Sequence, residues 1–344
     1  HLGSSAPGTP VTLPHDAMLA EERSQTSAGG TNTGWFAGYD YLYEKHFTPD
    51  AAQAAQCAVL EFEGVYHNAE VHLNGEKIAS CPYGYSDFYA DLTGKLLPGR
   101  DNVLEVIAHN ADQPNSRWYS GAGIYRPVTL WTAPARHILP DGVQVRTLSI
   151  DPAEVEVTVQ TTASGAVAVA ILDDEQTVAT AQAESNGKAV LRVQIPNAKL
   201  WSPDSPALYR CRAMFGDDCA ETTFGVRTLS WGDDGFLLNG KRVILLGACV
   251  HHDHGVLGAC CYPEAEERKV RLLQKVGYNA VRCAHNPCSK AFLDACDRLG
   301  MLVMDEYADM WYIHKTQYDY AGYLPDRWRQ DLESIVRKDY SHPS

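Results

Sequence analysis

Short alternating stretches of hydrophobic and polar residues dominate the chain from about Tyr39 to Trp131. Within them, Asn74-Gly75 separates two alternating runs. An Asn-Gly pair between strands is the strongest short hairpin signal, because a type I′ turn needs a positive φ at both positions. We predict a second hairpin where Pro98-Gly99 precedes the apolar run 103–108. Many short strands with turns between them are typical of a β-sandwich or jelly roll.

Short strand-like runs continue from about Arg136 to Arg227. They read "VEVTVQ", "AVAVAIL", "AVLRVQI" and "LYRCRAMF", and Gly, Pro, Asp and Asn separate them. A span of roughly 90 residues with this strand spacing suits an immunoglobulin-like sandwich. The Cys pair and the buried Trp of antibody domains are not evident.

The hydrophobic period changes after Thr228. The run "RVILLGACV" at 242–250 is continuously apolar, which predicts a strand covered on both faces. A helix is predicted to begin at Pro263 and end before Gly277, with acids in its first turn and bases later. The pattern then repeats as strand "NAVRCAH", helix 289–299, strand "MLVMDEY" and a helix over about 325–340. Successive βα units predict a parallel sheet, either doubly wound or a (β/α) barrel.

Polar, chemically capable residues follow each of the three predicted parallel strands. They are "HHDH" at 251–254 with His251 and Asp253, then Arg282, His285 and Asn286, then Asp305, Glu306 and Asp309. The carboxyl ends of parallel strands lie on one side of a sheet, and barrel active sites are built there. We therefore predict that these side chains form one functional rim.

Two chemical alternatives at this rim stay open. The four residues of "HHDH" suggest a metal site, but neighbouring residues on a strand point to opposite faces, so only alternate ones share a side. Asp305 and Glu306 either support the site or hydrogen-bond to its rim. They do not form the pair of facing carboxylates, ~5–5.5 Å apart, that a retaining glycosidase needs.

The amino-acid composition bears on the partners of the protein and on its cellular location. The chain has 43 acidic and 29 basic residues and a formal charge of −14, with no basic cluster, which disfavours nucleic acid as a partner. No run approaches the ~18–20 apolar residues that span a bilayer. The ten cysteines form no C-x-x-C pair, which favours a reducing compartment. We predict a cytoplasmic protein, with a secreted or periplasmic location open if the native N-terminus is missing.

The phrase "NAVRCAHNP…FLDACDRLGMLVMDEYADMW" resembles the signature of glycoside hydrolase family 2, the family of β-galactosidases, β-glucuronidases and β-mannosidases. The phrases "LPHD", "GWFAGYDYLYEKHF", "VHLNGEKI", "RWYSGAGIYRPVTLW", "FGVRTLSW" and "LLNGKRVILLGACVHHDHG" resemble the same family in the same order. The resemblance implies a multidomain chain. It comprises a sugar-binding jelly roll over 1–134, an immunoglobulin-like sandwich over 135–228, and the first three βα units of a truncated (β/α)8 TIM barrel over 229–344.

The resemblance also implies a retaining mechanism, in which one Glu protonates the leaving oxygen and a second Glu attacks the anomeric carbon. In the family, the acid/base Glu follows a phrase like "DYSHPS", with which this chain ends. We therefore assign no catalytic carboxylate here and expect this chain alone to be inactive. By motif position, His285 and Asn286 resemble substrate-facing residues, Arg282 resembles the Arg that steadies the nucleophile, and His251 and Asp253 match polar positions after the first strand.

One position departs from the family pattern. Some members place a sugar-binding carboxylate six residues before the Gly of "GIYR", where this chain has Arg117, followed by Trp118. An Arg can pair with a carboxylate and a Trp can stack on a sugar face. The departure leaves the substrate sugar open, and the alternative is that both residues only pack between domains.

Three functions follow from these observations. The first is a β-galactosidase-like exo-β-glycosidase, with a β-glucuronidase or other β-glycosidase of the family as its variant. The second is a carbohydrate-binding fragment without catalysis, and the third is a metal-dependent hydrolase using "HHDH". We predict a carbohydrate partner, neither nucleic acid nor membrane, and no cofactor. A divalent cation in the intact enzyme and a homo-oligomer both stay open.

Overall fold

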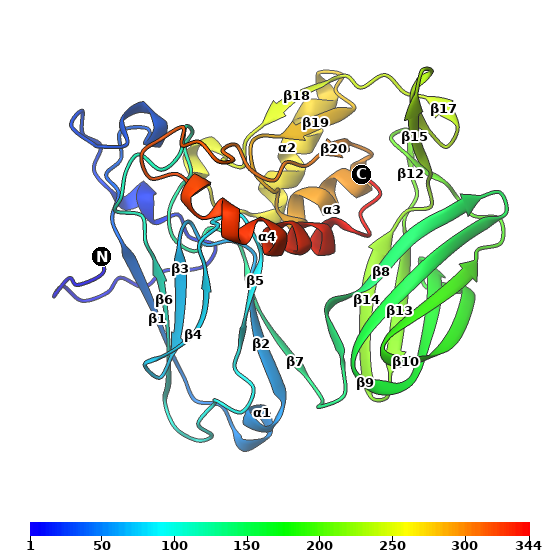
Figure 1. Cartoon of the computed structure of the whole chain (residues 1–344), viewed down its shortest axis with the longest axis horizontal. Coiled ribbons are helices and arrows are strands. Elements are labelled where there is room, and N and C mark those ends of the chain that lie inside the picture. Colours follow the sequence, from blue (N-terminus) through cyan, green and yellow to red (C-terminus); the bar gives the residue numbers. More distant parts are fainter.

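The computed structural model describes the whole chain, residues 1–344, and begins with a two-sheet β domain (Figure 1). One sheet has the order β1-β6-β3-β4 and the other β5-β2-β7. The strands are β1 Tyr41–Phe47, β2 Cys57–Phe62, β3 Ala69–Leu73, β4 Glu76–Cys81, β5 Phe88–Asp91, β6 Asn102–Ala108 and β7 Val128–Ala133, with helix α1 at Ala51–Ala55 and 3-10 turns η1 and η2 at Ala17–Ala20 and Gly30–Thr33. Alternating side chains from both sheets form one core of 13 buried residues.

The two predicted hairpins have different outcomes. Asn74 and Gly75 have φ values of 52° and 82° and join β3 to β4, which confirms the first hairpin. The second prediction is wrong, because β5 pairs with β2 in one sheet while β6 pairs with β1 and β3 in the other. The Asn102 side chain binds backbone groups of Leu97 and Arg100, so the Pro-Gly turn carries the chain between sheets.

The second domain is a β-sheet structure dominated by two long strands. Its main strands are β8 Ile138–Ile150, β9 Ala153–Asp173, β10 Gln176–Gln194, β13 Tyr209–Phe215 and β14 Asp218–Phe224, with the short pair β11 Trp201–Ser202 and β12 Ser205–Pro206. The runs "VEVTVQ" and "AVAVAIL" both belong to β9, which pairs with β8 through its first half and with β13 through its second. The core of this domain has 20 buried residues.

The last part of the chain contains a parallel sheet covered by helices. A small antiparallel sheet of β15 Leu229–Gly232, β16 Gly235–Leu238 and β17 Lys241–Arg242 leads to parallel strands β18 Gly247–Val250, β19 Ala280–Cys283 and β20 Leu302–Met304. The helices are α2 Pro263–Lys275, α3 Lys290–Leu299 and α4 Leu324–Asp339, with η3 at Gly255–Leu257 and η4 at Tyr320–Gly322. The predicted βα order is confirmed. No helix combines the length and the apolar character needed to cross a bilayer.

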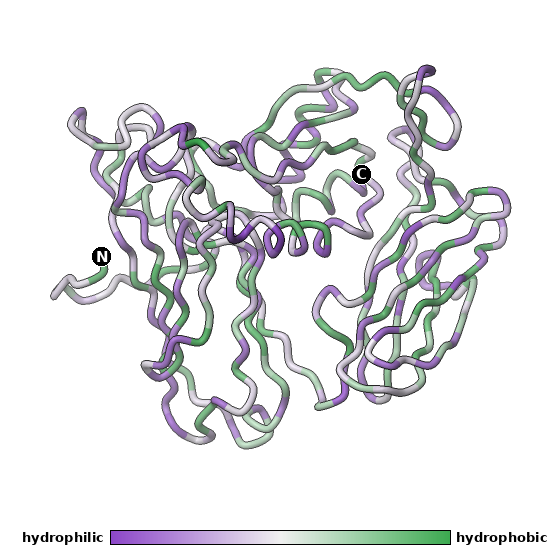
Figure 2. The backbone as a smooth tube through the Cα atoms, viewed as in Figure 1, coloured by the Kyte–Doolittle hydropathy of each residue, from purple (hydrophilic) through white to green (hydrophobic).

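The first strand of this sheet is shorter and more exposed than predicted. β18 begins at Gly247, and the apolar residues before it, Ile244, Leu245 and Leu246, are 65%, 46% and 55% exposed. Figure 2 shows this hydrophobic segment on the connection between β17 and β18. The prediction of a strand covered on both faces is wrong, because β18 lies at the sheet edge and these side chains meet no neighbouring layer.

Candidate functional site

The polar residues that follow β18 and β19 lie together on one side of the parallel sheet, as predicted. The rings of His251 and His285 are 5.6 Å apart. Trp118, from the loop between β6 and β7, lies 5.3 Å from the His285 ring and 6.1 Å from the His251 ring. The first domain therefore supplies an aromatic wall to a rim built by the parallel strands.

Arg282 and Glu306 form the charged centre of the rim. The Arg282 Nε donates a hydrogen bond to Glu306, and Arg282 Nη1 lies 3.3 Å from the thiol of Cys249. Glu306 is also 3.4 Å from Nδ1 of His285. Glu306 thus holds the guanidinium and the imidazole on opposite sides of one carboxylate, which fixes both groups at the edge of the site.

Asp305 turns away from Glu306, as expected for neighbours at a strand end. Its carboxylate accepts a hydrogen bond from the Cys288 backbone at 3.0 Å and lies 3.9 Å from the Lys338 ammonium. Burial raises the pKa of Asp305 to about 6. The two carboxylates therefore do not face each other across an open site.

The four residues of "HHDH" diverge rather than converge. His251 faces the rim, whereas His252 is hydrogen-bonded to the Ser120 carbonyl at 3.1 Å and His254 lies 3.2 Å from Glu266. Burial lowers the pKa of His252 to about 3, so this ring is neutral. Asp253 is half-buried beside them. Because the rings point to different partners, the loop does not present a set of metal ligands.

Asn286 lies beneath the rim rather than on it. The residue is 3% exposed, and its Nδ2 has no hydrogen-bond partner. It lines a small cavity of about 20 Å³ together with His251, Cys283 and Cys288. A cavity of this size has room for one water molecule, and the Asn286 amide is a polar partner for it.

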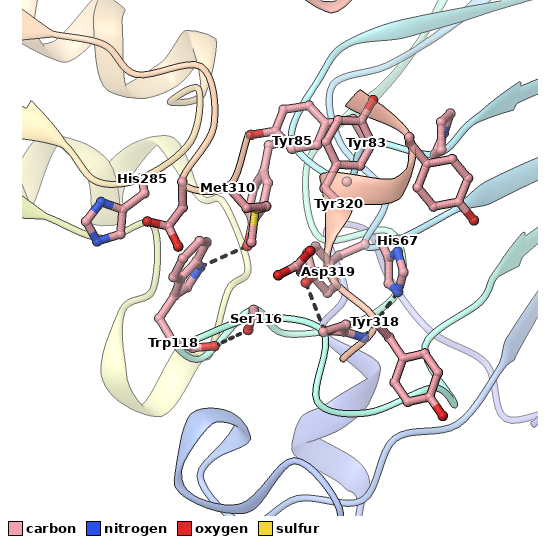
Figure 3. A pocket seen from close by; sticks show the side chains of 16 residues that line it. His67, Tyr83, Tyr85, Ser116, Trp118, His285, Met310, Tyr318, Asp319 and Tyr320 are labelled. Atoms are coloured by element: carbon pink, nitrogen blue, oxygen red, sulfur yellow. Dashed lines mark hydrogen bonds between the residues drawn. The ribbon is translucent and has the colours of Figure 1, made fainter. Parts of the chain in front are cut away.

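Arg117 is paired with a carboxylate of its own chain. Its Nε and Nη2 donate to the two oxygens of Asp309 at 2.8 and 2.6 Å, and Lys315 donates to the same carboxylate at 2.8 Å. The next residue, Trp118, donates its indole N–H to the Tyr85 hydroxyl at 2.9 Å. Both residues therefore join the first domain to the rim, and the Trp118 ring still faces His285 (Figure 3).

A cluster of aromatic residues beside the rim was not predicted from the sequence. Tyr66, Tyr83, Tyr85, Tyr320 and Met310 pack together between the first domain and the segment after β20. They line a cavity of about 30 Å³ that also borders Trp118 and His285. Figure 3 shows Tyr83, Tyr85, Met310 and Tyr320 at this cavity. The signal available was the density of Tyr at 83–85 and 318–323, but nothing in the spacing brings these segments together.

Two buried charged residues position the rim loops and were also missed. Arg126 donates to the carbonyl oxygens of Tyr85 at 3.0 Å and of Pro287 at 2.6 Å, so it holds the loop that carries His285. Asp16 accepts hydrogen bonds from the backbone of Ala122 and Ala259 at 3.0 and 2.9 Å. Each residue ties the first domain to a loop that follows a parallel strand.

Three family models match consecutive parts of the chain. Residues 10–136 match the glycosyl hydrolase 2 galactose-binding domain-like model, residues 140–227 match glycosyl hydrolases family 2, and residues 230–344 match the TIM barrel domain of glycosyl hydrolases family 2. The matched ranges together extend over nearly all of the sequence.

Individual proteins give the same result. The chain is 38% identical to beta-galactosidase BoGH2A of Bacteroides ovatus, over 97% of this chain and 42% of that protein. It is 32% identical to a putative beta-glucuronidase of Formosa agariphila, over 97% of this chain and 34% of that protein. The crystal structure of a glycosyl hydrolase family 2 member from Bacteroides cellulosilyticus superposes with a TM-score of 0.91 at 37% identity, covering 97% and 46% of the two chains. The chain therefore spans less than half the length of these relatives.

Proposed function

Because the chain belongs to glycoside hydrolase family 2, we propose that it is part of a retaining exo-β-glycosidase of the β-galactosidase type. The observation that carries the proposal is the rim itself. The ring of Trp118 stands over His251 and His285, and the Arg282–Glu306 pair lies beside them. An aromatic face with hydrogen-bonding groups at its edge suits a sugar ring.

The proposed roles follow from what each side chain faces. Trp118 stacks on the sugar, and His251 and His285 bind its hydroxyl groups. Arg282 steadies the carboxylate nucleophile. Glu306 fixes the Arg282 guanidinium in the position that this role requires. Asp305, Asp253 and Asn286 support the loops from below.

The two carboxylates of the retaining mechanism are assigned to other parts of the full-length protein. The mechanism needs two facing carboxyl groups ~5–5.5 Å apart, and Asp305 and Glu306 turn to different partners. We propose the three parallel strands as part of a (β/α)8 barrel and expect residues 1–344 alone to show no turnover.

Arg117 bears on the choice of sugar. Its guanidinium is already bound by Asp309, so the carboxylate of a glucuronide has to compete with an internal partner. A galactoside has no carboxylate that must compete with Asp309 for the guanidinium. This difference favours galactosidase activity over glucuronidase activity.

The test compares nitrophenyl β-galactoside and nitrophenyl β-glucuronide as substrates of the protein as its gene encodes it. We expect a higher kcat/KM for the galactoside and no turnover by a purified chain confirmed by intact mass to end at Ser344. Preference for the glucuronide contradicts the assigned sugar. Turnover by residues 1–344 contradicts the assignment of the catalytic carboxylates.

A carbohydrate-binding fragment is the second candidate, because Trp118 and the two His rings are assembled within these residues. Galactose titrated into residues 1–344 tests it through indole fluorescence, with Trp118→Ala as the variant and the exposed Trp231→Ala as the control. Binding that only the first variant abolishes supports a binding role without catalysis. The absence of a galactose-dependent change speaks against it.

A further inference from the structure

Three groups of side chains in this chain have the composition and spacing of metal ligands. In the group Glu61, Asp87 and Asp141, the Lys290 ammonium already lies 3.1 Å from Asp141 and forms an ion pair with Glu61. A cation is therefore already provided there by the protein. Cys283, Cys288 and Asp305 form a different group, because two of its members are thiols with no cation between them.

A second acidic group is also engaged. In the group Asp294, Asp297 and His342, the His342 ring is 2.6 Å from Asp297, which also accepts the Ser344 backbone N–H at 3.0 Å. These contacts occupy the Asp297 oxygens. In the thiol-containing group, Asp305 accepts the Cys288 backbone N–H, but no charged side chain pairs with either sulfur atom.

The fold itself brings Cys283, Cys288 and Asp305 together. Cys283 ends β19, Cys288 follows the four-residue loop that carries His285, and Asp305 follows β20, which pairs with β19 in parallel. Their ligand atoms lie within 4.8 Å of one another. The two Cys residues are 4% and 7% exposed, so the group lies beneath the rim and not on the surface.

The small cavity next to the thiols supplies a fourth position. Cys283 and Cys288 both line it, and so does Asn286, whose buried Nδ2 has no partner. A water molecule in this cavity can bind a metal ion and accept a hydrogen bond from that amide. Three protein ligands and one water complete the tetrahedron that zinc prefers.

The charges around the group favour a cation. Two thiolates and the Asp305 carboxylate carry three negative charges, and the buried Lys338 ammonium, 3.9 Å from Asp305, is shared with the carboxylate of Asp339. A divalent cation offsets two of the three charges, while the two thiol protons leave to solvent. Arg126, the other buried cation nearby, is engaged by backbone carbonyl groups.

We propose that Cys283 Sγ, Cys288 Sγ and one oxygen of Asp305 bind a thiophilic divalent cation, with Zn²⁺ as the natural choice. Thiolate sulfur and carboxylate oxygen are both ligands that zinc accepts. The ion closes the loop between the two Cys residues and so fixes the loop that carries His285 and Asn286. This metal site does not depend on the proposed glycosidase activity.

Cobalt tests the site, because Co²⁺ replaces Zn²⁺ and gives sulfur-to-cobalt charge-transfer absorption when thiolates bind it. Co²⁺ is titrated into the reduced, chelator-treated protein and the near-ultraviolet band is followed. We expect saturation at one ion per chain. Cys288→Ser and Cys283→Ser are expected to abolish the band, and Asp305→Asn is expected to weaken binding by about 10-fold or more.

Cys219→Ser is the matched control, because Cys219 is an exposed free thiol on β14 and is not one of the three proposed ligands. It is expected to leave the titration unchanged. The proposal is overturned if no charge-transfer band forms, or if the band survives Cys288→Ser or disappears with Cys219→Ser. Far-ultraviolet circular dichroism of each variant shows that it is folded, and a variant that fails this check is replaced by Cys288→Ala.

Discussion

The Asp87 carboxyl group lies inside the protein with neither oxygen hydrogen-bonded. Burial raises its pKa to about 7, although the Lys338 and Lys290 ammonium groups act in the opposite direction. Burial also raises the pKa of the neighbouring Glu63 to about 7. An unfolded chain releases these protons near pH 4, whereas the folded chain retains them up to about pH 7. These groups therefore lower the free energy of unfolding as pH rises between these values.

Replacing Asp87 by Asn removes this effect, because the amide cannot ionise. We expect Asp87→Asn to raise the stability at pH 8 by about 1–2 kcal/mol relative to the natural chain, with the difference shrinking towards pH 5. Thermal unfolding of both proteins at the two pH values measures it. Asp204→Asn, at an exposed position, is the control and should show no such trend. A difference that is equal at both pH values refutes the buried charge as its cause.

At the level of single residues, the sequence located the rim but not what supports it. His251, Arg282 and His285 were predicted together because each lies at or just beyond the end of a parallel strand, and strand ends meet at one edge by geometry. Arg126 and Asp16 were missed because they bind backbone groups that are distant in the sequence. Pro287 lies 161 residues from Arg126, and Ala259 lies 243 residues from Asp16. A hydrogen bond to a distant carbonyl leaves no pattern in the sequence.

At the level of elements, the start of α3 connects all three domains. Lys290, its first residue, forms ion pairs with Glu61 on β2 and Asp141 on β8. The Glu61 side chain is also bound by the Trp131 indole at 2.7 Å. A helix from the parallel-sheet domain thus inserts its ammonium between one strand of each β domain.

Replacing Lys290 by Met leaves these buried carboxylates without their cation. We expect a loss of about 3–5 kcal/mol, because breaking a buried ion pair strands an uncompensated charge. Urea denaturation measures the loss, and limited proteolysis near residues 134–137 should become faster as the domains separate. Lys188→Met, at an exposed site outside any ion pair, is the control. A Lys290→Met protein as stable as the control shows that the junction does not depend on this ammonium.

The helices were predicted more accurately than the strands around them. Pro263, Gly277 and Gly300 are local signals, and the residues that carry them start or end helices where expected. The run at 242–250 was wrongly predicted to be a strand covered on both faces. A continuous apolar sequence fits such a strand, but whether a layer covers it is a property of the tertiary structure. The length of β9 was also not predicted. Its first half pairs with β8 and its second half with β13, and this pairing is likewise a property of the tertiary structure.

At the level of the whole molecule, a hydrophobic face remains uncovered next to the edge strand β18. Ile244, Leu246 and Val276 are all more than half exposed, and β18 has a partner on one side only. Unpaired edges and apolar patches favour association. We expect residues 1–344 to self-associate in light scattering, and Ile244→Glu to reduce the apparent mass. A monodisperse monomer of the natural chain contradicts this prediction.

The guanidinium of Arg126 has a consequence for how this protein can be divided. It belongs to the first β domain, yet it holds the Pro287 carbonyl directly behind the rim. His252 takes its partner from Ser120 in the same domain. A version of the protein that starts at the parallel sheet therefore lacks part of the inner wall of its own site. The first domain is therefore not an interchangeable accessory module. A chimera with a relative keeps these two contacts only if Arg126 and the loop around Ser120 are exchanged together with the strands that they support.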